Sequence, residues 1–183
     1  MINKKFFTNY YLELSNLLMT VDFEALNNLS DAIKNAHQQG NKIILAGNGG
    51  SASIASHASV DLTKSSKIRA INFNEPNLIT CFANDFGYEH WISQGLIAFA
   101  DKGDLIILIS SSGQSKNMIN GAKTARELGC KIVTFSGFLE NNPLKQLGHI
   151  NFYVNSTSYN YVEMAHYIWL LSSIDLVSQN QSQ

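Results

Sequence analysis

The stretch Asp104-Leu-Ile-Ile-Leu-Ile-Ser-Ser-Ser-Gly-Gln-Ser115 decides the fold. Its first part is a continuous apolar run, which is typical of a strand buried on both faces of a parallel sheet. Met118, Ile119 and Ala122 follow at helical spacing, so the strand passes through a short loop into a helix. Repeated strand–helix units of this kind build an α/β fold with right-handed crossovers.

The loop between this strand and this helix carries binding chemistry. Its hydroxyl groups come from Ser110, Ser111, Ser112 and Ser115. Together with the backbone of Gln114 and the free N–H groups of the helix start, they form a cage for a phosphate dianion that needs no Lys or Arg. A serine-rich cap without a ligand is the alternative, but four serines in six positions exceed what capping requires.

A second loop of the same kind follows an earlier strand at 42–46 and reads Gly47-Asn-Gly-Gly-Ser-Ala-Ser53. Glycines let the backbone adopt positive φ and approach a ligand closely. We therefore expect ligand contacts here, from Asn48, Gly49, Gly50 and Ser51. The loop lacks the Gly-Lys-Ser/Thr of a phosphate-binding nucleotide loop and the GxGxxG spacing, so we expect no nucleotide cofactor. A plain glycine-rich turn is the alternative.

The remaining elements complete one domain over residues 1–183. Strands are predicted at 42–46, 68–73, 104–109, 131–135 and 149–154, and helices at 3–21, 22–39, 51–64, 88–100, 115–128, 143–147 and 160–178. The predicted fold is a three-layer α/β/α sandwich with a five-stranded parallel sheet of flavodoxin-like type. An N-terminal helical hairpin (1–40) precedes the α/β core and C-terminal helix (41–178), and a polar tail (179–183) follows.

Composition excludes several classes of protein. Hydrophobic residues make up 45% of the 183 residues and charged residues 15%, with a net charge of −1. This charge disfavours general nucleic-acid binding, and the low charged fraction leaves room for an apolar interface between subunits. The most apolar late stretch, 161–177, contains charged residues and is too short to span a membrane. Cys81 and Cys130 lack a CxxC spacing and are predicted to be buried free thiols of a cytoplasmic protein.

The two loops, GNGGSA and SSSGQS about 60 residues apart, resemble those of the sugar isomerase (SIS) domain family. The two leading helices, the segment Cys81-Phe-Ala-Asn-Asp-Phe-Gly-Tyr88 and a long C-terminal helix with Glu163 extend the resemblance to the phosphoheptose isomerase branch, over roughly residues 5–177. The resemblance implies an aldose–ketose isomerase that converts sedoheptulose 7-phosphate to D-glycero-D-manno-heptose 7-phosphate. It also implies a homotetramer with active sites at subunit interfaces.

The resemblance further implies individual site residues. His57 and Asp61 match a metal ligand and the ligand that also acts as base, and Asp85 matches a residue that contacts the sugar. The segment Tyr159-Asn-Tyr161 opens the last helix where the family has other polar substrate contacts, so we expect the substrate specificity to differ there. The chain departs from the family pattern at Asp61, where the family has a glutamate, and beside Glu163, where Val162 replaces a glutamine and Leu170 replaces a histidine.

The residues themselves offer a replacement for these two losses. Glu163 and His166 are three positions apart and share a helix face, as do His57 and Asp61, which are four apart. If the two helices face each other, the four side chains could bind zinc. The second alternative is a metal-free site with Asp61 as base and His166 as acid. A third is that His166 is a histidine satisfied within an interface.

Two functions remain open from the sequence. The first is isomerisation of a phosphorylated sugar through an enediol, which needs a base and an acid. The second is a non-catalytic phosphosugar-binding or regulatory protein, since some relatives of this branch bind a replication initiator. The pair Glu163 and His166 favours the enzyme, because a degenerate site should lack such compensating residues.

Overall fold

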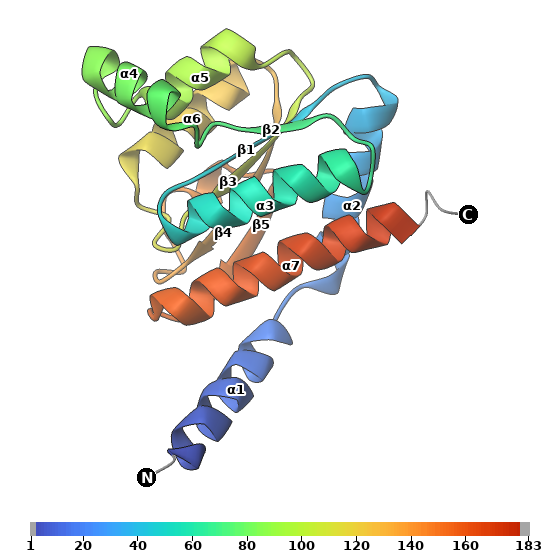
Figure 1. Cartoon of the computed structure of the whole chain (residues 1–183), viewed down its shortest axis with the longest axis vertical. Coiled ribbons are helices and arrows are strands. Elements are labelled where there is room, and N and C mark those ends of the chain that lie inside the picture. The colour runs from blue at the N-terminus through green and yellow to red at the C-terminus, as the bar shows by residue number, and fades with distance from the viewer. Residues whose placement is uncertain (1–2, 180–183) are drawn as a thin grey trace.

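A computed structural model of the chain describes residues 3–179 (Figure 1). Its sheet contains the strands β1 (Ile43–Gly47), β2 (Ala70–Asn72), β3 (Leu105–Ile109), β4 (Lys131–Gly137) and β5 (Ile150–Val154). The strand order is β2-β1-β3-β4-β5, and all neighbouring pairs are parallel. This is the doubly wound order of the flavodoxin type, so the predicted fold class is confirmed.

Helices cover both faces of the sheet. One face packs on α2 (Phe23–Gln38), α3 (Gly50–Lys64) and α7 (Tyr159–Gln179), and the other on α4 (Pro76–Phe86), α5 (Trp91–Phe99) and α6 (Lys116–Glu127). Alternate residues of each strand point to opposite faces of the sheet. Ile43 packs in the core beneath α2, α3 and α7, and Ile44 packs in the core beneath α4, α5 and α6. The central strands β1 and β3 are buried along their whole length, as their continuous apolar runs predict.

The first helix, α1 (Lys4–Leu18), departs from the predicted hairpin. It does not fold back along α2 but extends away from the body of the molecule (Figure 1). It contacts the core along α7: the rings of Tyr10 and Tyr161 lie 4.6 Å apart, and the Trp169 Nε1–H donates to the Leu18 carbonyl at 3.0 Å. No residue of α1 is buried, and Phe6, Phe7 and Tyr11 are more than half exposed. The prediction of two helices is right, and that of a hairpin is wrong.

One helix was not predicted at all. The segment Pro76–Phe86 forms α4, which begins with a proline in its first turn. The carboxylate of Glu75 accepts a hydrogen bond from the Leu78 N–H and caps the helix. These two start signals stand in the sequence, and Leu78, Ile79 and Phe82 on one side of the helix pack against the core although no residue of the helix is fully buried. Cys81 lies on this helix and is exposed, which corrects the prediction that both thiols are buried; Cys130 is buried.

The other predicted elements are present with shifted ends. The short predicted helix at 143–147 is a single 3-10 turn, η1 (Lys145–Leu147), and the predicted strand at 68–73 contracts to β2. Of the predicted tail, residue 179 ends α7 and 180–183 lie outside the described residues. Between residues 3 and 179, no helix has the length and apolar character needed to cross a membrane.

Candidate active site

The site lies at the carboxyl ends of β1 and β3, which are neighbours in the sheet. Gly47 pairs with Ile109 at the last position of the register, so the loops after the two strands leave from adjacent points. The chain then crosses to opposite faces, through α3 after β1 and through α6 after β3. This divergence is the topological switch point where open α/β sheets bind ligands.

A pocket of about 290 Å³ lies at this point. Its lining comes from the two loops and the start of α7: Asn48, Gly49, Gly50, Ser51, Ser110, Ser111, Ser112, Ser115, Tyr159 and Glu163. The structure thus brings together eight of the nine loop residues that we predicted from the two glycine- and serine-rich segments. The ninth, Gln114, does not line the pocket; its N–H donates to Ser112 Oγ at 3.2 Å and shapes the turn.

The serine loop ends at the N-terminus of α6. Ser115 is the N-cap residue, yet its side chain makes no capping hydrogen bond. In contrast, α2 is capped by the carboxylate of Asp22 and α4 by that of Glu75. A helix start without a side-chain cap leaves N–H donors and the positive end of the helix dipole for an anion. Ser110 and Ser111 are buried and Ser110 Oγ lies 3.4 Å from Ser115 Oγ, so the hydroxyls are already gathered.

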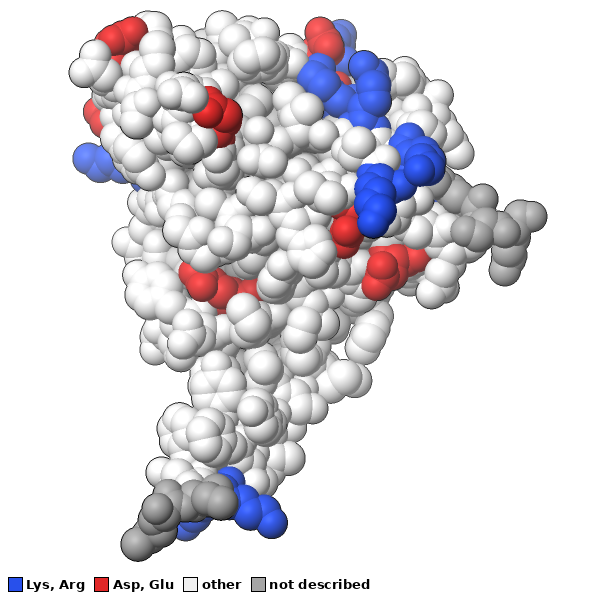
Figure 2. All heavy atoms as spheres, viewed as in Figure 1, with Lys and Arg blue, Asp and Glu red and all other residues white. Residues whose placement is uncertain are grey.

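The pocket contains one carboxylate and is lined by no Lys or Arg. Glu163 projects from the first turns of α7, and its Oε1 accepts a hydrogen bond from Ser111 Oγ at 3.3 Å. Its carboxylate also lies against Gly50, where an added Cβ would overlap it. The absence of a side chain at Gly50 therefore lets the carboxylate stand between the two loops. In Figure 2 many of the Lys and Arg side chains of the viewed face lie toward its upper right, and others lie at the left edge and at the lower end.

The pair His57 and Asp61 lies elsewhere, on the outer side of α3. His57 Nε2 is 3.2 Å from Asp61 Oδ2, and the Tyr167 hydroxyl of α7 makes a hydrogen bond with His57 Nδ1. The His57 side chain is 46% exposed and neither residue lines the pocket. In one chain these groups face outward rather than toward the serine loop.

His166 is fully buried and faces the sheet rather than the pocket. Its Nε2–H donates to the carbonyl of Ser136 at 3.0 Å, and its ring packs edge-on against Phe135. Burial lowers the pKa of this histidine to about 4, and the Ser136 carbonyl opposes that shift only in part. In one chain the structure therefore places His166 in the core, away from the pocket where the predicted acid was expected.

The predicted set of four zinc ligands does not assemble in one chain. Between residues 3 and 179, no three or more His, Cys, Asp or Glu side chains gather where they could hold a metal ion. The physical reason is the orientation of α7: Glu163 points into the pocket, whereas His166, one turn later, points into the core. His57 and Asp61 face outward on α3, so the donor set present does not fit zinc.

Two further residues differ from expectation or were missed. Asp85 is the next-to-last residue of α4, accepts a hydrogen bond from Asn84 Nδ2 and does not line this pocket, so its predicted contact with the sugar stays a prediction. Asn117 was overlooked, although it stands in the first turn of the helix that follows the serine loop; it is buried and bonded to Asn48. Tyr159 lines the pocket at the start of α7, where we expected a difference in specificity.

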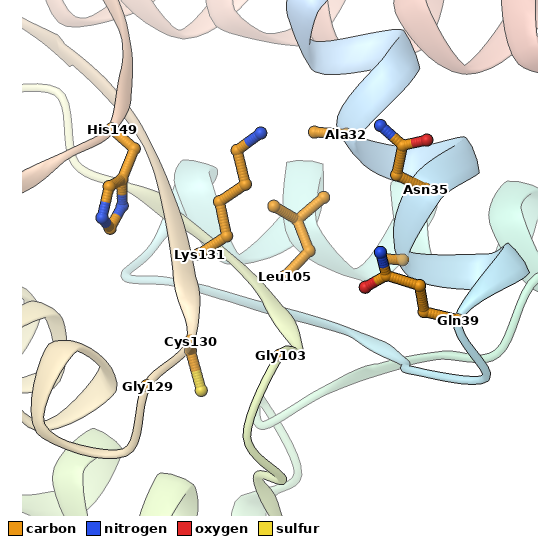
Figure 3. Close-up of a pocket in the computed structure, with 10 residues that line it drawn as sticks. Ala32, Asn35, Gln39, Gly103, Leu105, Gly129, Cys130, Lys131 and His149 are labelled. Atoms are coloured by element: carbon orange, nitrogen blue, oxygen red, sulfur yellow. The ribbon is translucent and has the colours of Figure 1, made fainter.

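A larger hollow of about 430 Å³ lies at the opposite edge of the sheet. Figure 3 shows it between α2 and the starts of β3 and β4, with the side chains of Asn35, Gln39 and Lys131 around it. It offers no serine cage and no helix N-terminus, and it lies at the amino ends of the strands. The chemistry and the topology both favour the smaller pocket.

The fold and the pocket define a doubly wound α/β protein with a neutral, hydroxyl-lined anion site at its switch point. The sequence model of the SIS domain matches residues 7–137, and the chain belongs to the SIS domain family. Within it, the chain falls in the phosphoheptose isomerase branch. It is 35% identical over 152 residues to the phosphoheptose isomerase of Aliarcobacter butzleri, which covers 80% of each chain. It is 36% identical over 135 residues to the probable phosphoheptose isomerase of Thermoplasma acidophilum, covering 70% of this chain and 74% of that one.

Solved structures agree on the fold. The phosphoheptose isomerase from Neisseria gonorrhoeae matches 97% of this chain and 100% of its own, with a TM-score of 0.88 at 21% identity. The phosphoheptose isomerase from Francisella tularensis matches 98% and 100%, with a TM-score of 0.89 at 20% identity. The family resemblance inferred from the two loops is thereby confirmed.

Proposed function

We propose that the protein is an aldose–ketose isomerase that converts sedoheptulose 7-phosphate to D-glycero-D-manno-heptose 7-phosphate through an enediol. The observation that carries the proposal is the pocket in which Glu163 stands beside a serine cage and the free start of α6. The names of the relatives at 35–36% identity support the choice of substrate.

The phosphate group occupies the serine cage. Ser110, Ser112 and Ser115 offer hydroxyl donors, and the helix start adds backbone N–H groups. These neutral donors bind the oxygens of a phosphate dianion through hydrogen bonds and the helix dipole, without a charged side chain. The cage therefore fixes one end of an open-chain sugar, and the reacting carbons extend toward Glu163.

Glu163 performs the proton transfer. It is the carboxylate in the pocket, and the hydrogen bond from Ser111 holds it in place. As a carboxylate it removes a proton from C1 of the ketose, which gives the enediol, and it returns a proton to C2 to form the aldose. The proton on the C1 oxygen moves to the C2 oxygen in the same exchange, so the reaction is redox-neutral overall. This role replaces the pair Asp61 and His166 that the sequence favoured.

The reaction proceeds without a metal ion. The supporting observation is the divergence of the predicted donors, since His57 and Asp61 face outward and His166 faces the core. Purified protein is therefore expected to hold far less than one zinc per subunit, and chelation is expected to leave its activity unchanged. One zinc per subunit, with activity lost on chelation and restored by zinc, would overturn the metal-free assignment.

We further propose a cytoplasmic homotetramer. The exposed aromatic face of α1, which includes Phe6, Phe7 and Tyr11, needs a partner because a lone helix of 15 residues is marginal in water. Closed D2 symmetry is a common solution for such chains. The free thiols of Cys81 and Cys130 suit a reducing compartment.

The decisive experiment is isotope exchange. Sedoheptulose 7-phosphate is incubated with the protein in deuterated water, and label is sought at C2 of the aldose product. The expected result is one deuterium at C2, and a rate that falls by about 10²–10⁴ in Glu163→Gln. His57→Ala serves as the comparison variant and is expected to retain more activity.

The same experiment tests the non-catalytic alternative. A regulatory protein would bind the sugar phosphate through the serine cage and exchange no label. Tight binding without exchange, in both the wild type and Glu163→Gln, would replace the isomerase by that alternative.

A further inference from the structure

Two asparagines form a reciprocal amide pair across the switch point. Asn48 Nδ2 donates to Asn117 Oδ1 at 3.1 Å, and Asn117 Nδ2 donates to Asn48 Oδ1 at 2.9 Å. Asn48 belongs to the loop after β1, whereas Asn117 lies in the first turn of α6 and is only 2% exposed. The pair therefore connects the glycine-rich loop to the helix that closes the serine cage.

A third residue completes this arrangement. The hydroxyl of Tyr88 donates to Asn48 Oδ1 at 3.1 Å. Tyr88 belongs to the turn between α4 and α5, and its ring lies 6.5 Å from that of Trp91, which is fully buried. The tyrosine reaches the loop after β1 from a different part of the fold, since it stands 40 residues further along the chain.

The hydrogen-bonding capacity of the Asn48 side chain is almost used up by these contacts. A side-chain amide has two acceptor lone pairs and two N–H donors. Asn117 and Tyr88 occupy both lone pairs of Asn48 Oδ1, and Asn117 also takes one N–H. One N–H is left, and Asn48 lines the pocket. The only polar bond that this side chain offers to a ligand is therefore a donated one.

We propose that Asn117 and Tyr88 are positioning residues that hold Asn48 as a hydrogen-bond donor toward an acceptor oxygen of the bound sugar phosphate. The inference rests on the proposed function for the identity of the ligand, but the orientation of the amide is a property of the protein alone. Without Tyr88, Oδ1 regains a free lone pair and the amide can rotate, so its orientation is no longer fixed. The site would then accept either a donor or an acceptor at this position and would bind the proper ligand less well.

The first test follows the amide without any ligand. Hydrogen exchange of the side-chain N–H groups of Asn48 and Asn117 is measured by NMR, with exposed Asn28 of α2 as reference. At least one proton of each pair member is expected to exchange about tenfold or more slowly than those of Asn28, and Tyr88→Phe is expected to speed up exchange at Asn48. Exchange as fast as at Asn28, or no response to Tyr88→Phe, would overturn the proposal.

The second test is a double-mutant cycle on turnover of sedoheptulose 7-phosphate. Tyr88→Phe is expected to raise KM about two- to tenfold, the effect of one hydrogen bond, with kcat within about twofold of the wild type. In the Asn48→Ala background the same change is expected to leave KM unaltered, because Tyr88 acts only through Asn48. An equal effect in both backgrounds would mean that Tyr88 contacts the sugar itself or acts only on folding, and would refute the positioning role.

A matched control comes from β5. Tyr153→Phe also removes a phenolic hydroxyl, which donates to the carbonyl of Phe138 at 3.1 Å and lies 3.5 Å from Asn155 Oδ1. It is expected to leave KM unchanged, and a KM shift equal to that of Tyr88→Phe would count against the proposal. If the wild type turns over no sedoheptulose 7-phosphate, the proposed function fails while the exchange experiment still decides the orientation of Asn48. Asn117 is tested by exchange in Asn117→Ala, which removes both the acceptor of the Asn48 N–H and the donor to Asn48 Oδ1; faster exchange at Asn48 is expected, and unchanged exchange would refute its role.

Discussion

Lowering the pH should destabilise this protein through one residue, His166. In the folded chain its Nε2–H donates to Ser136, whereas its Nδ1 is buried and has no hydrogen-bond partner between residues 3 and 179. A proton on Nδ1 would place a positive charge in the core beside Phe135 and Trp169, with no acceptor for the new N–H. For this reason the folded pKa is lowered from 6.5 to about 4.

The sign and size of this pH effect follow from the linkage between proton binding and folding. Below pH 6.5 the unfolded chain protonates His166 and the folded chain does not, so the unfolded state binds more protons and the free energy of unfolding falls as the pH falls. The stabilisation is complete above about pH 6.5 and is lost progressively down to about pH 4. Between pH 7 and pH 5 the loss from this residue is about 2 kcal/mol, at 1.36 kcal/mol for each pKa unit.

The assay is urea denaturation at pH 7, 6 and 5 at one fixed protein concentration, since the stability of an oligomer depends on concentration. The comparison variant is His166→Gln, which keeps an N–H donor for Ser136 and does not titrate. The wild type is expected to lose about 2 kcal/mol more than this variant, and exposed His37→Gln is expected to behave like the wild type. Equal losses in the wild type and His166→Gln, or an imidazole that titrates near pH 6.5 by NMR, would refute the reasoning and restore His166 as a candidate acid.

Three further predictions concern the pocket and the assembly. Ser112→Ala combined with Ser115→Ala should weaken phosphosugar binding by about 0.5–1.5 kcal/mol per hydroxyl, and up to roughly 3 for each bond to the dianion; unchanged affinity by calorimetry would exclude the cage. Gly50→Ala should lower kcat by tenfold or more, because its Cβ displaces Glu163, while phosphate binding persists; unchanged kcat would show that the carboxylate is not at the reacting carbons. Phe7→Glu should shift the assembly toward smaller species in light scattering, by placing a charge on the exposed face of α1; a monomeric wild type at micromolar concentration would refute the tetramer.

The sequence alone determined the sheet and the position of the site. Continuous apolar runs are needed wherever a strand is covered on both faces, so 42–46, 104–109 and 131–135 identified the three interior strands β1, β3 and β4. The loops after β1 and β3 could be recognised because the binding groups of each loop are close together in the sequence. Four serines surround Gly113, and three glycines lie within Gly47–Gly50. Since parallel strands end at the same edge of a sheet, these loops had to meet.

The tertiary structure decided which side chains complete the site. Helical spacing placed Glu163 and His166 on one face of α7, but a helix face is wide, and its neighbours differ along its length. Near its start α7 borders the loops, so Glu163 reaches the pocket; one turn later it borders β4, so His166 is enclosed. No periodicity in the sequence carries this information, because it depends on where the helix axis crosses the edge of the sheet.

The same reason explains the pair Asn48 and Asn117 and the course of α1. The two asparagines are 69 residues apart, and their pairing exists only because β1 and β3 are neighbours. For α1, the aromatic pattern predicted a helix with an apolar face. It did not predict which surface this face packs against, because the hydrophobic effect is not directional. Local sequence determines the secondary structure and the side chains that each segment presents. The packing of distant segments determines which other residues those side chains contact.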